Sequence, residues 1–185
     1  MPSPFRPSKL GVIMTCSIVF CVKNSADSIE NAVKNVILQQ PFEVIVIDGD
    51  SNDGTLEIIQ RLSGIKVYSD EGRGLSYARR LGVEKSSGKY IIFIGPDNII
   101  PQNFIHDMVA QKIKFGWDVC SARTRIENPK TYWDFGMDFR WICNMGAVGE
   151  TDVPGTPNIY SRSVFKEINF LDANLQAADD TYIFD

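Results

Sequence analysis

Three carboxylates follow a short apolar run at residues 42–55, which read Phe-Glu-Val-Ile-Val-Ile-Asp-Gly-Asp-Ser-Asn-Asp-Gly-Thr. A Val- and Ile-rich segment followed directly by a helical pattern predicts a buried parallel strand. Ligands of open α/β sheets bind beyond the carboxyl ends of the strands, so Asp48, Asp50 and Asp53 are expected where a ligand binds. Three acids there fit sugar or ribose hydroxyls, base N–H donors or a metal ion better than bare phosphate. Asp53 taken alone is better explained as a cap for the following helix.

Charged residues that could act on the same ligand recur at three further places. Arg79 lies in a segment with helical periodicity, and Asp97 follows the apolar run 90–94 in a Gly-Pro-Asp-Asn turn. Asp179 and Asp180 stand near the C-terminus. An arginine fork suits a nucleotide or its diphosphate, whereas a carboxylate can bind a divalent ion or accept a proton from a hydroxyl. Each residue also has a structural interpretation: a solvated helix arginine, a plain turn and a helix N-cap pair.

The elements that would position these residues alternate between strand and helix patterns, without repeats or low-complexity segments. Repeated βα units predict an α/β protein, with a mostly parallel central sheet and helices on both faces. Residues 126–150 break the rhythm with aromatic side chains among glycines and acids, and a surface flap is expected there. The expected strands are 17–22, 43–47, 66–68, 90–94, 118–123 and 159–160, and the expected helices are 25–39, 55–62, 75–85, 102–115 and one beginning near Arg162.

The composition indicates one soluble globular domain. A length of 185 residues suits a single α/β domain with a sizeable core. The net charge of −4, with scattered Lys and Arg, gives no reason to expect nucleic acid as a partner. We therefore expect an N-terminal arm at residues 1–15 and one domain over 16–185.

Cysteine and histidine usage narrows the chemistry and the compartment. Cys16, Cys21, Cys120 and Cys143 show no C-x-x-C spacing, which argues against a zinc site and favours a reducing compartment. The single histidine, His106, excludes chemistry that needs a histidine cluster. The sequence has no run of 18 apolar residues, so no transmembrane helix is expected. A cytoplasmic protein is expected, with peripheral association at the cytoplasmic face of a membrane as an option.

Taken in order, these segments resemble the inverting nucleotide-sugar glycosyltransferases of family 2, which have the GT-A fold. Residues 17–24 (Ser-Ile-Val-Phe-Cys-Val-Lys-Asn) look like that family's first strand with its Asn-ended turn, and 47–55 like its acidic nucleotide loop. Residues 74–82 (Gly-Leu-Ser-Tyr-Ala-Arg-Arg-Leu-Gly) are similar to its small-x-x-Ala-Arg-x-x-Gly helix. Residues 87–93 look like the strand before its metal motif. The resemblance covers nearly the whole chain from residue 16.

The resemblance implies transfer of a sugar from a nucleotide-diphosphate donor, more readily a UDP-sugar than a GDP-sugar, to an acceptor hydroxyl with inversion. A Mg²⁺ or Mn²⁺ ion at Asp97 would neutralise the leaving diphosphate. Asp180 corresponds to the family's catalytic aspartate, the general base, and Asp179 to the preceding glutamate. The acceptor stays open between a glycan, a lipid-linked molecule and a small molecule. The residues that the resemblance assigns to the nucleotide are Asn24, Asp48, Asp50, Arg79 and Pro96.

The chain departs from the family pattern in the metal motif and in the nucleotide loop. Gly95 stands where the usual Asp-x-Asp motif has its first acid, so a contact of that acid with sugar or ribose is missing, whereas metal binding through Asp97 is expected to survive. Gly49 stands where many relatives have a second Asp. Asp48 or Asp50 would then accept a hydrogen bond from a uracil N–H or a ribose hydroxyl. Arg80 occupies a position where the family often has Asn.

Other functions fit the sequence less well. A sugar-phosphate nucleotidyltransferase needs a Gly-rich basic turn after the first strand, but residues 22–26 (Val-Lys-Asn-Ser-Ala) contain no glycine. A Rossmann dehydrogenase would show G-x-G-x-x-G at the same place. A member that binds a nucleotide sugar or glycan without turnover stays open because of Gly95, whereas Asp97 and Asp180 favour catalysis. Because the chain stops five residues after Asp180, we expect either a naturally short protein or a truncated one.

Overall fold

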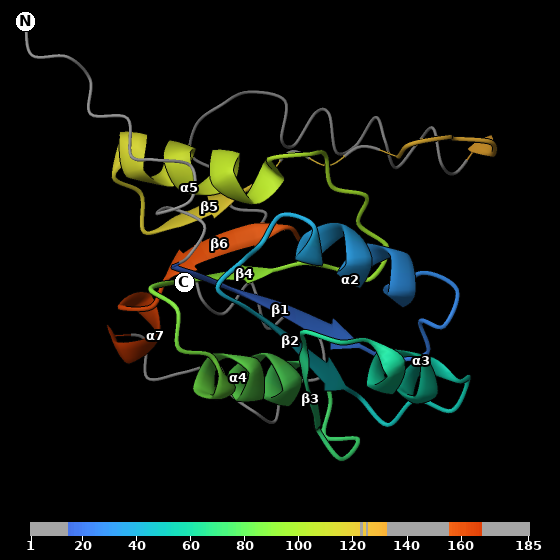
Figure 1. Cartoon of the computed structure of the whole chain (residues 1–185). Coiled ribbons are helices and arrows are strands. Elements are labelled where there is room, and N and C mark those ends of the chain that lie inside the picture. Colours follow the sequence, from blue (N-terminus) through green and yellow to red (C-terminus); the bar gives the residue numbers. More distant parts are fainter. Residues whose placement is uncertain (1–14, 123, 125, 133–155, 168–185) are drawn as a thin grey trace, which may run out of the picture.

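The computed structural model describes residues 15–122, 124, 126–132 and 156–167. They build one six-stranded sheet in the order β3-β2-β1-β4-β6-β5 (Figure 1). Strands β1 to β4 pair in parallel, whereas β6 runs antiparallel to both β4 and β5. The predicted α/β class with a mostly parallel sheet is therefore confirmed. The strands are β1 (Cys16–Val22), β2 (Glu43–Asp48), β3 (Lys66–Ser69), β4 (Tyr90–Phe93), β5 (Val119–Ser121) and β6 (Asn158–Ser161), and the helices are α2 (Ile29–Ile37), α3 (Thr55–Arg61), α4 (Leu75–Lys85), α5 (Phe104–Phe115) and α7 (Val164–Glu167).

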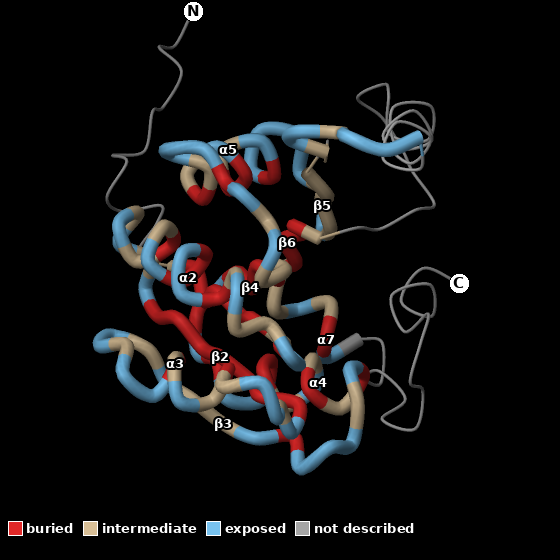
Figure 2. Tube along the Cα trace, turned by 90° about the vertical axis from the view of Figure 1, so that its right-hand side faces the viewer, coloured by how far each residue is buried: buried red, intermediate tan, exposed pale blue. Residues whose placement is uncertain are grey.

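Helices cover both faces of the sheet and close a separate apolar core on each. Helices α2, α3 and α5 pack on one face, and α4 and α7 on the other (Figure 1). Side chains of β1 alternate between the two cores: Ile18 and Phe20 face the first, and Val19 faces the second. The buried strands lie between layers whose outer surfaces are exposed (Figure 2). This double coverage explains why the strands are near-continuous apolar runs in the sequence.

Strand β2 is buried along its whole length and carries an acid at its end. All six of its residues, Glu43 to Asp48, are buried. Its register with β1 pairs Asp48 with Val22, so the two strands end together. Helix α4 lies close over β1, because a Cβ on Gly82 would overlap Cγ1 of Val19. The core therefore holds both the strand that ends in Asp48 and the helix that carries Arg79.

Element boundaries differ from the sequence-based prediction where loop contacts replace helical turns. Helix α2 begins at Ile29 rather than at residue 25, because Ser28 has a non-helical φ of −123° and the Ser25 carbonyl accepts the N–H groups of both Ser28 and Ile29 in the turn before it. Helix α5 begins at Phe104, after Asn103 in a left-handed conformation. Strand β5 covers only Val119–Ser121 of the expected 118–123. Most of the predicted arm and of the predicted flap lies outside the described residues.

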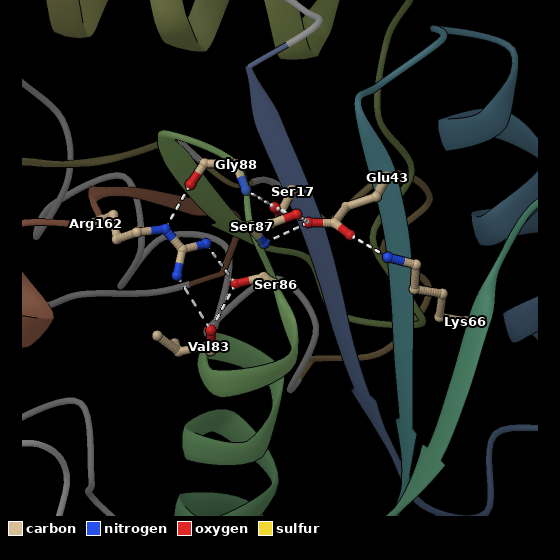
Figure 3. Close-up of polar contacts among 8 residues, drawn as sticks. All are labelled: Ser17, Glu43, Lys66, Val83, Ser86, Ser87, Gly88 and Arg162. Carbon is tan, nitrogen blue, oxygen red and sulfur yellow. Dashed lines mark hydrogen bonds and ion pairs between the residues drawn. The ribbon is translucent and has the colours of Figure 1, made fainter.

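A buried carboxylate fastens the amino ends of the strands. Glu43 Oε1 accepts hydrogen bonds from Ser17 Oγ at 2.6 Å and from the Ser87 N–H at 2.6 Å, and its Oε2 pairs with Lys66 Nζ at 2.7 Å (Figure 3). Burial alone would raise the pKa of Glu43, but the hydrogen bonds from Lys66, Ser17 and Ser87 together outweigh it and hold that pKa at about 2. Glu43 is therefore ionised at neutral pH and ties β1, β2 and β3 to the loop before β4.

Arg162 binds the same loop from the other side (Figure 3). Its guanidinium donates to the carbonyl of Gly88 at 2.7 Å and to Ser86 Oγ at 2.8 Å. A longer bond of 3.3 Å reaches the carbonyl of Val83 in the last turn of α4. These bonds connect the end of β6 to the end of α4. No helix in the described ranges is long and apolar enough to span a membrane.

Candidate functional site

Asp48, at the carboxyl end of β2, has a buried carboxylate oxygen that no described residue contacts by a hydrogen bond. The residue is 2% exposed. Its Oδ2 accepts the N–H of Ser51 at 3.2 Å, whereas Oδ1 makes no hydrogen bond within the described part of the chain. An unpaired buried acceptor costs free energy, and such a cost at a strand end is typical of a position that a ligand completes. Asp48 is therefore the described acid best placed to accept a ligand N–H or O–H.

Asp50 lies two residues further along the loop, exposed and against the neighbouring loop. Its backbone is left-handed, with φ of 62°. A Cβ added to Gly72 would lie 3.7 Å from Oδ2 of Asp50, so the carboxylate sits beside the loop between β3 and α4. Asp50 is thus available to a ligand at the rim of the same edge.

Asn24 braces the loops that follow β1 and β2. Its Oδ1 accepts the N–H of Asn52 at 3.0 Å, and its own N–H donates to Ser51 Oγ at 2.9 Å. A φ of 50° turns the chain at this point. The nucleotide contact expected of Asn24 stays a prediction, and the contacts within the chain give it a bracing role.

Asp53 braces the same two loops and does not belong to the buried edge. Its Oδ2 accepts the N–H of Ala26 and its Oδ1 the N–H of Thr55, both at 3.0 Å. Hydrogen bonds, first that of the Thr55 hydroxyl and then that of the Ala26 N–H, hold the pKa of Asp53 below its ordinary value. The N-cap of α3 is Gly54, without a side-chain cap hydrogen bond, so the predicted capping role of Asp53 is wrong in that form. Its carboxylate lies one residue earlier, accepts the N–H of the first helical residue and also crosses to the loop after β1.

Asp70 is a buried acid at this edge that the sequence analysis missed. It is 1% exposed, and its N–H donates to the carbonyl of Asp48 at 2.9 Å. Its carboxylate accepts the N–H of Gly72 at 2.8 Å and that of Gly74 at 3.2 Å, which fixes the entry to α4. The alternation of Gly and charged residues at 70–74 is a loop signal and says nothing of burial, so the sequence offered no means to find it.

Arg79 reaches from α4 towards the end of β4. Its guanidinium carbon lies 5.9 Å from the ring centroid of Phe93, the last residue of β4. The neighbouring Arg80 instead pairs with Glu84 on the exposed side of the helix, with Nε and Oε1 2.8 Å apart. The two arginines therefore differ in position, and Arg79 is the one directed to the sheet, where the diphosphate contact was predicted.

Asp97 lies in a tight turn just beyond β4. The Asn98 N–H donates to the carbonyl of Gly95 at 3.1 Å, and Asn98 Oδ1 accepts the Gly95 N–H at 2.8 Å. Pro96 is half-buried within this turn, whereas Asp97 is exposed. The turn interpretation and the ligand interpretation of Asp97 are thus compatible, because the turn holds the residue out at the strand end.

The structure brings these residues to one edge of the sheet. Strands β2, β1 and β4 are neighbours, so Asp48 and the turn with Asp97 are separated by two strand spacings, about 10 Å. A base or ribose near Asp48 and a charged diphosphate near Asp97 would suit that span. No group of three or more possible metal ligands occurs among the residues that the structure describes. Asp179 and Asp180, the predicted base and its neighbour, lie outside them.

A cavity of about 370 Å³ lies at the opposite, amino edge, lined by residues that include Phe42, Glu43, Gly64 and Lys66. Its two charged side chains pair with each other. The buried side-chain nitrogen and oxygen atoms left without a partner in the described ranges belong to other residues, namely Asp48, Ser76 and Asn158. The unsatisfied acceptor of Asp48 at the carboxyl edge is therefore a stronger indication of a ligand site than the volume of this cavity.

One family model and several curated proteins match the chain. The family model described as Glycosyl transferase family 2 matches residues 17–169. A cholesterol galactosyltransferase of Borreliella burgdorferi is 30% identical over 95 residues, 48% of this chain and 26% of that protein. Glycosyltransferase AglE of Haloferax volcanii is 29% identical over 122 residues, 61% of this chain and 40% of that protein. The chain spans less than half the length of these curated relatives.

Solved structures of low sequence identity share the fold. S. aureus TarS 1-349 in complex with UDP has a TM-score of 0.72 at 18% identity, covering 91% of this chain and 54% of that one. Glucosyl-3-phosphoglycerate synthase from Mycobacterium tuberculosis, in complex with Mn²⁺, UDP and glucosyl-3-phosphoglycerate, has a TM-score of 0.60 at 19% identity, covering 88% and 64%. These likenesses confirm the predicted GT-A fold.

Proposed function

The chain belongs to glycosyl transferase family 2, and from this premise we propose that it transfers a sugar from a nucleotide-diphosphate donor to an acceptor hydroxyl. The observation that carries the proposal is the buried Oδ1 of Asp48 at the carboxyl end of β2, which has no hydrogen-bond partner among the described residues. An imide N–H of uracil or a ribose hydroxyl would donate to this oxygen and remove the cost of leaving it unpaired. UDP is the favoured nucleotide, because the complexes of S. aureus TarS contain UDP or UDP-GlcNAc.

The proposed site uses Asp48 and Asp50 for the nucleoside and Arg79 for the diphosphate. Asp50 is exposed beside Asp48 and can accept from a ribose hydroxyl. Arg79 supplies a positive charge beside the strand end at Phe93. Asn24 shapes the loop beneath the nucleotide through Ser51 and Asn52. These roles match the edge at which open α/β sheets bind their ligands.

The single carboxylate of Asp97, just after β4, fits a divalent ion that would be held mainly by the diphosphate. Asp97 is an exposed carboxylate in a hydrogen-bonded turn, and its side chain has no hydrogen bond or ion pair to any described residue. Mg²⁺ and Mn²⁺ prefer such oxygen ligands and commonly use one or two carboxylates together with substrate phosphates. When bound, the ion would neutralise charge on the departing diphosphate. Pro96 would hold Asp97 at the strand end.

For the chemical step we propose inversion at the transferred sugar. Asp180 would accept the proton of the acceptor hydroxyl as that oxygen attacks the face opposite the leaving group. Asp179 would orient the acceptor. Both roles rest on the sequence motif alone. The acceptor could be a glycan, a lipid-linked molecule or a small molecule, and a lipid-linked one would require association with a membrane surface.

The proposed setting is a reducing compartment such as the cytoplasm. No disulfide joins Cys16, Cys21 and Cys120 in the described part of the chain. Burial raises the pKa of Cys16 to about 12, which makes it an apolar core residue in practice. This thiol usage is what supports the compartment.

A binding experiment tests the function at its main residue. UDP and UDP-sugars should stabilise the full chain in a thermal shift assay with Mn²⁺, since a ligand that binds only the folded state raises its stability. Asp48→Asn should abolish most of that shift, whereas Glu57→Gln, an exposed acid on α3, should retain it. Equal shifts in both variants would contradict the assignment. Hydrolysis of the donor without added acceptor would separate an enzyme from a member that only binds.

A further inference from the structure

Asn158 is a second buried polar residue whose side chain is only partly satisfied. The residue is 2% exposed. Its Nδ2 donates to the hydroxyl of Tyr160 at 2.9 Å, which fixes the amide from one side. Its Oδ1 is buried and has no hydrogen-bond partner among the described residues. Because a buried acceptor left unpaired costs free energy, this oxygen calls for a donor that the described chain does not supply.

The register of the sheet places Asn158 beside the end of β4. Asn158 is the first residue of β6 and pairs with Phe93, the last residue of β4. Since β6 runs antiparallel to β4, the first residue of β6 lies at the edge where β4 ends (Figure 1). This is the edge at which the donor is proposed to bind. Asn158 therefore lies next to the strand end that leads into the turn with Asp97.

Asn158 also lies on the face of the sheet that α4 covers. Its bond to the Tyr160 hydroxyl sets its side chain on the same side as that ring. Tyr160 and Phe93 belong to the core beneath α4, with their ring centroids 5.8 Å apart. From α4, the guanidinium carbon of Arg79 lies 5.9 Å from the centroid of the same Phe93 ring. Arg79 and Asn158 therefore approach the end of β4 from one face.

The order of the strands matches the order of the groups in a nucleotide sugar. Strands β2, β1, β4 and β6 follow one another in the sheet. The proposed function assigns the nucleoside to Asp48 on β2 and the diphosphate to Arg79 and the turn after β4. The next group of such a donor is its sugar, and the next strand is β6. Three strand spacings, about 14 Å, separate the strand that ends in Asp48 from the strand that begins with Asn158.

We propose that Asn158 is a specificity-determining residue, whose Oδ1 accepts a hydrogen bond from a hydroxyl of the transferred sugar. The inference rests on the proposed function and adds the sugar contact to it. A hydroxyl donates to an amide oxygen and would remove the cost of the unpaired acceptor. Because Oδ1 is covered, the sugar must displace a covering group to reach it. A sugar without the matching hydroxyl would leave the acceptor unpaired and be rejected.

The experiment is a calorimetric titration of the full chain in Mn²⁺ with UDP, UDP-glucose, UDP-galactose and UDP-N-acetylglucosamine. The ratio of each UDP-sugar affinity to the UDP affinity measures what the sugar contributes, and a change in nucleotide binding alone does not alter it. Asn158→Leu replaces the amide by an apolar group of similar size, and Asn158→Ala introduces no new contact. Ser161→Ala, half-buried at the other end of β6, is the matched control. Thermal unfolding reports whether each variant keeps the fold.

We expect the parent to bind at least one of these UDP-sugars more tightly than UDP. Both Asn158 variants should lower that ratio about 2- to 10-fold, the usual effect of losing one hydrogen bond. The UDP affinity should stay unchanged, and Ser161→Ala should keep the parent ratio. A role of Asn158 in the sheet alone would not separate UDP from the UDP-sugars.

Three results would overturn the inference and leave the proposed function standing. These are a parent-like ratio in the Asn158 variants, an equal loss of UDP and UDP-sugar affinity, and a parent that binds UDP as tightly as every UDP-sugar. Unfolding of both variants would give the amide a structural role in the sheet and overturn the inference as well. A parent that binds neither UDP nor any of the UDP-sugars would contradict the proposed function itself, and this inference with it.

Discussion

The backbone N–H of Asp70 donates to the carbonyl of Asp48 over 2.9 Å, and this bond joins two buried acids at the ends of neighbouring strands. The two carboxylates have different tasks. Both oxygens of Asp70 accept backbone N–H groups of the loop that leads into α4. Asp48 keeps one oxygen without a partner in the described part of the chain. One acid organises the edge and the other is left for a ligand.

Asp70→Asn should destabilise the fold, because an amide offers one acceptor oxygen where the loop needs two. A buried N–H group left unpaired costs about 1–3 kcal/mol. Urea unfolding should therefore show a lower free energy of unfolding. Asp48→Asn is the comparison, since it removes an incompletely paired buried charge and should change stability little. A larger loss of stability in Asp48→Asn than in Asp70→Asn would reverse these roles.

Asp48→Ala should weaken nucleotide binding more than Asp53→Ala. The carboxylate of Asp53 accepts hydrogen bonds from the N–H groups of Ala26 and Thr55, so its loss should loosen the two loops and lower the melting temperature. Asp48→Ala removes the carboxylate that is proposed to accept a hydrogen bond from the ligand. Titration calorimetry with UDP and Mn²⁺ gives the affinities, and the reverse ranking would show that the loop roles are exchanged.

UDP should bind much more weakly in EDTA than in Mn²⁺, because the proposed ion at Asp97 would neutralise charge on the diphosphate. Asp97→Ala should remove the metal-dependent part of the affinity and leave the melting temperature in EDTA unchanged, since Asp97 is exposed and forms no side-chain hydrogen bond or ion pair with the described residues. Calorimetry with and without Mn²⁺ measures both. Equal UDP affinity in EDTA and in Mn²⁺ for the parent would rule out the metal role.

Asp180→Asn should leave donor binding nearly unchanged and slow transfer by roughly 10²–10⁴-fold, the usual cost of losing a general base. The base contacts the acceptor rather than the donor, so the two measurements should separate. Asp179→Asn should have a milder effect on the rate. Transfer at the parent rate in Asp180→Asn would place the base elsewhere, and unfolding of both variants would favour a helix-capping role for the pair.

Acid should weaken the fold through Glu43. Its pKa is about 2 in the folded protein against an ordinary 4.5, so the folded state binds the proton less readily than the unfolded chain does. Its contribution is complete above about pH 4.5 and declines as the pH falls towards 2. The free energy of unfolding of the parent in urea should therefore exceed that of Glu43→Gln by less at about pH 3 than at about pH 5. A constant difference would exclude this role.

The repeating elements and one end of the site could be predicted because their signals are local. The run from Val44 to Ile47 contains no polar residue, as expected of a strand that is buried on both faces, and Asp48 follows it. The helical segment with Arg79 and the Gly-Pro-Asp-Asn turn also depend on neighbours in the chain. Each of these needs only side-chain periodicity and turn chemistry within a few residues.

The tertiary structure decided how those pieces meet. The placement of β6 between β4 and β5, the burial of Asp70, and the contacts of Glu43 and Arg162 with residues 86–88 all join segments far apart in the sequence. Such contacts depend on strand order and register, which no local pattern encodes. The hydrogen-bond partners of a carboxylate depend on the same contacts. Asp48 and Asp70 are the same residue type, but the packed loops donate to both carboxylate oxygens of Asp70 and leave one oxygen of Asp48 without a partner among the described residues.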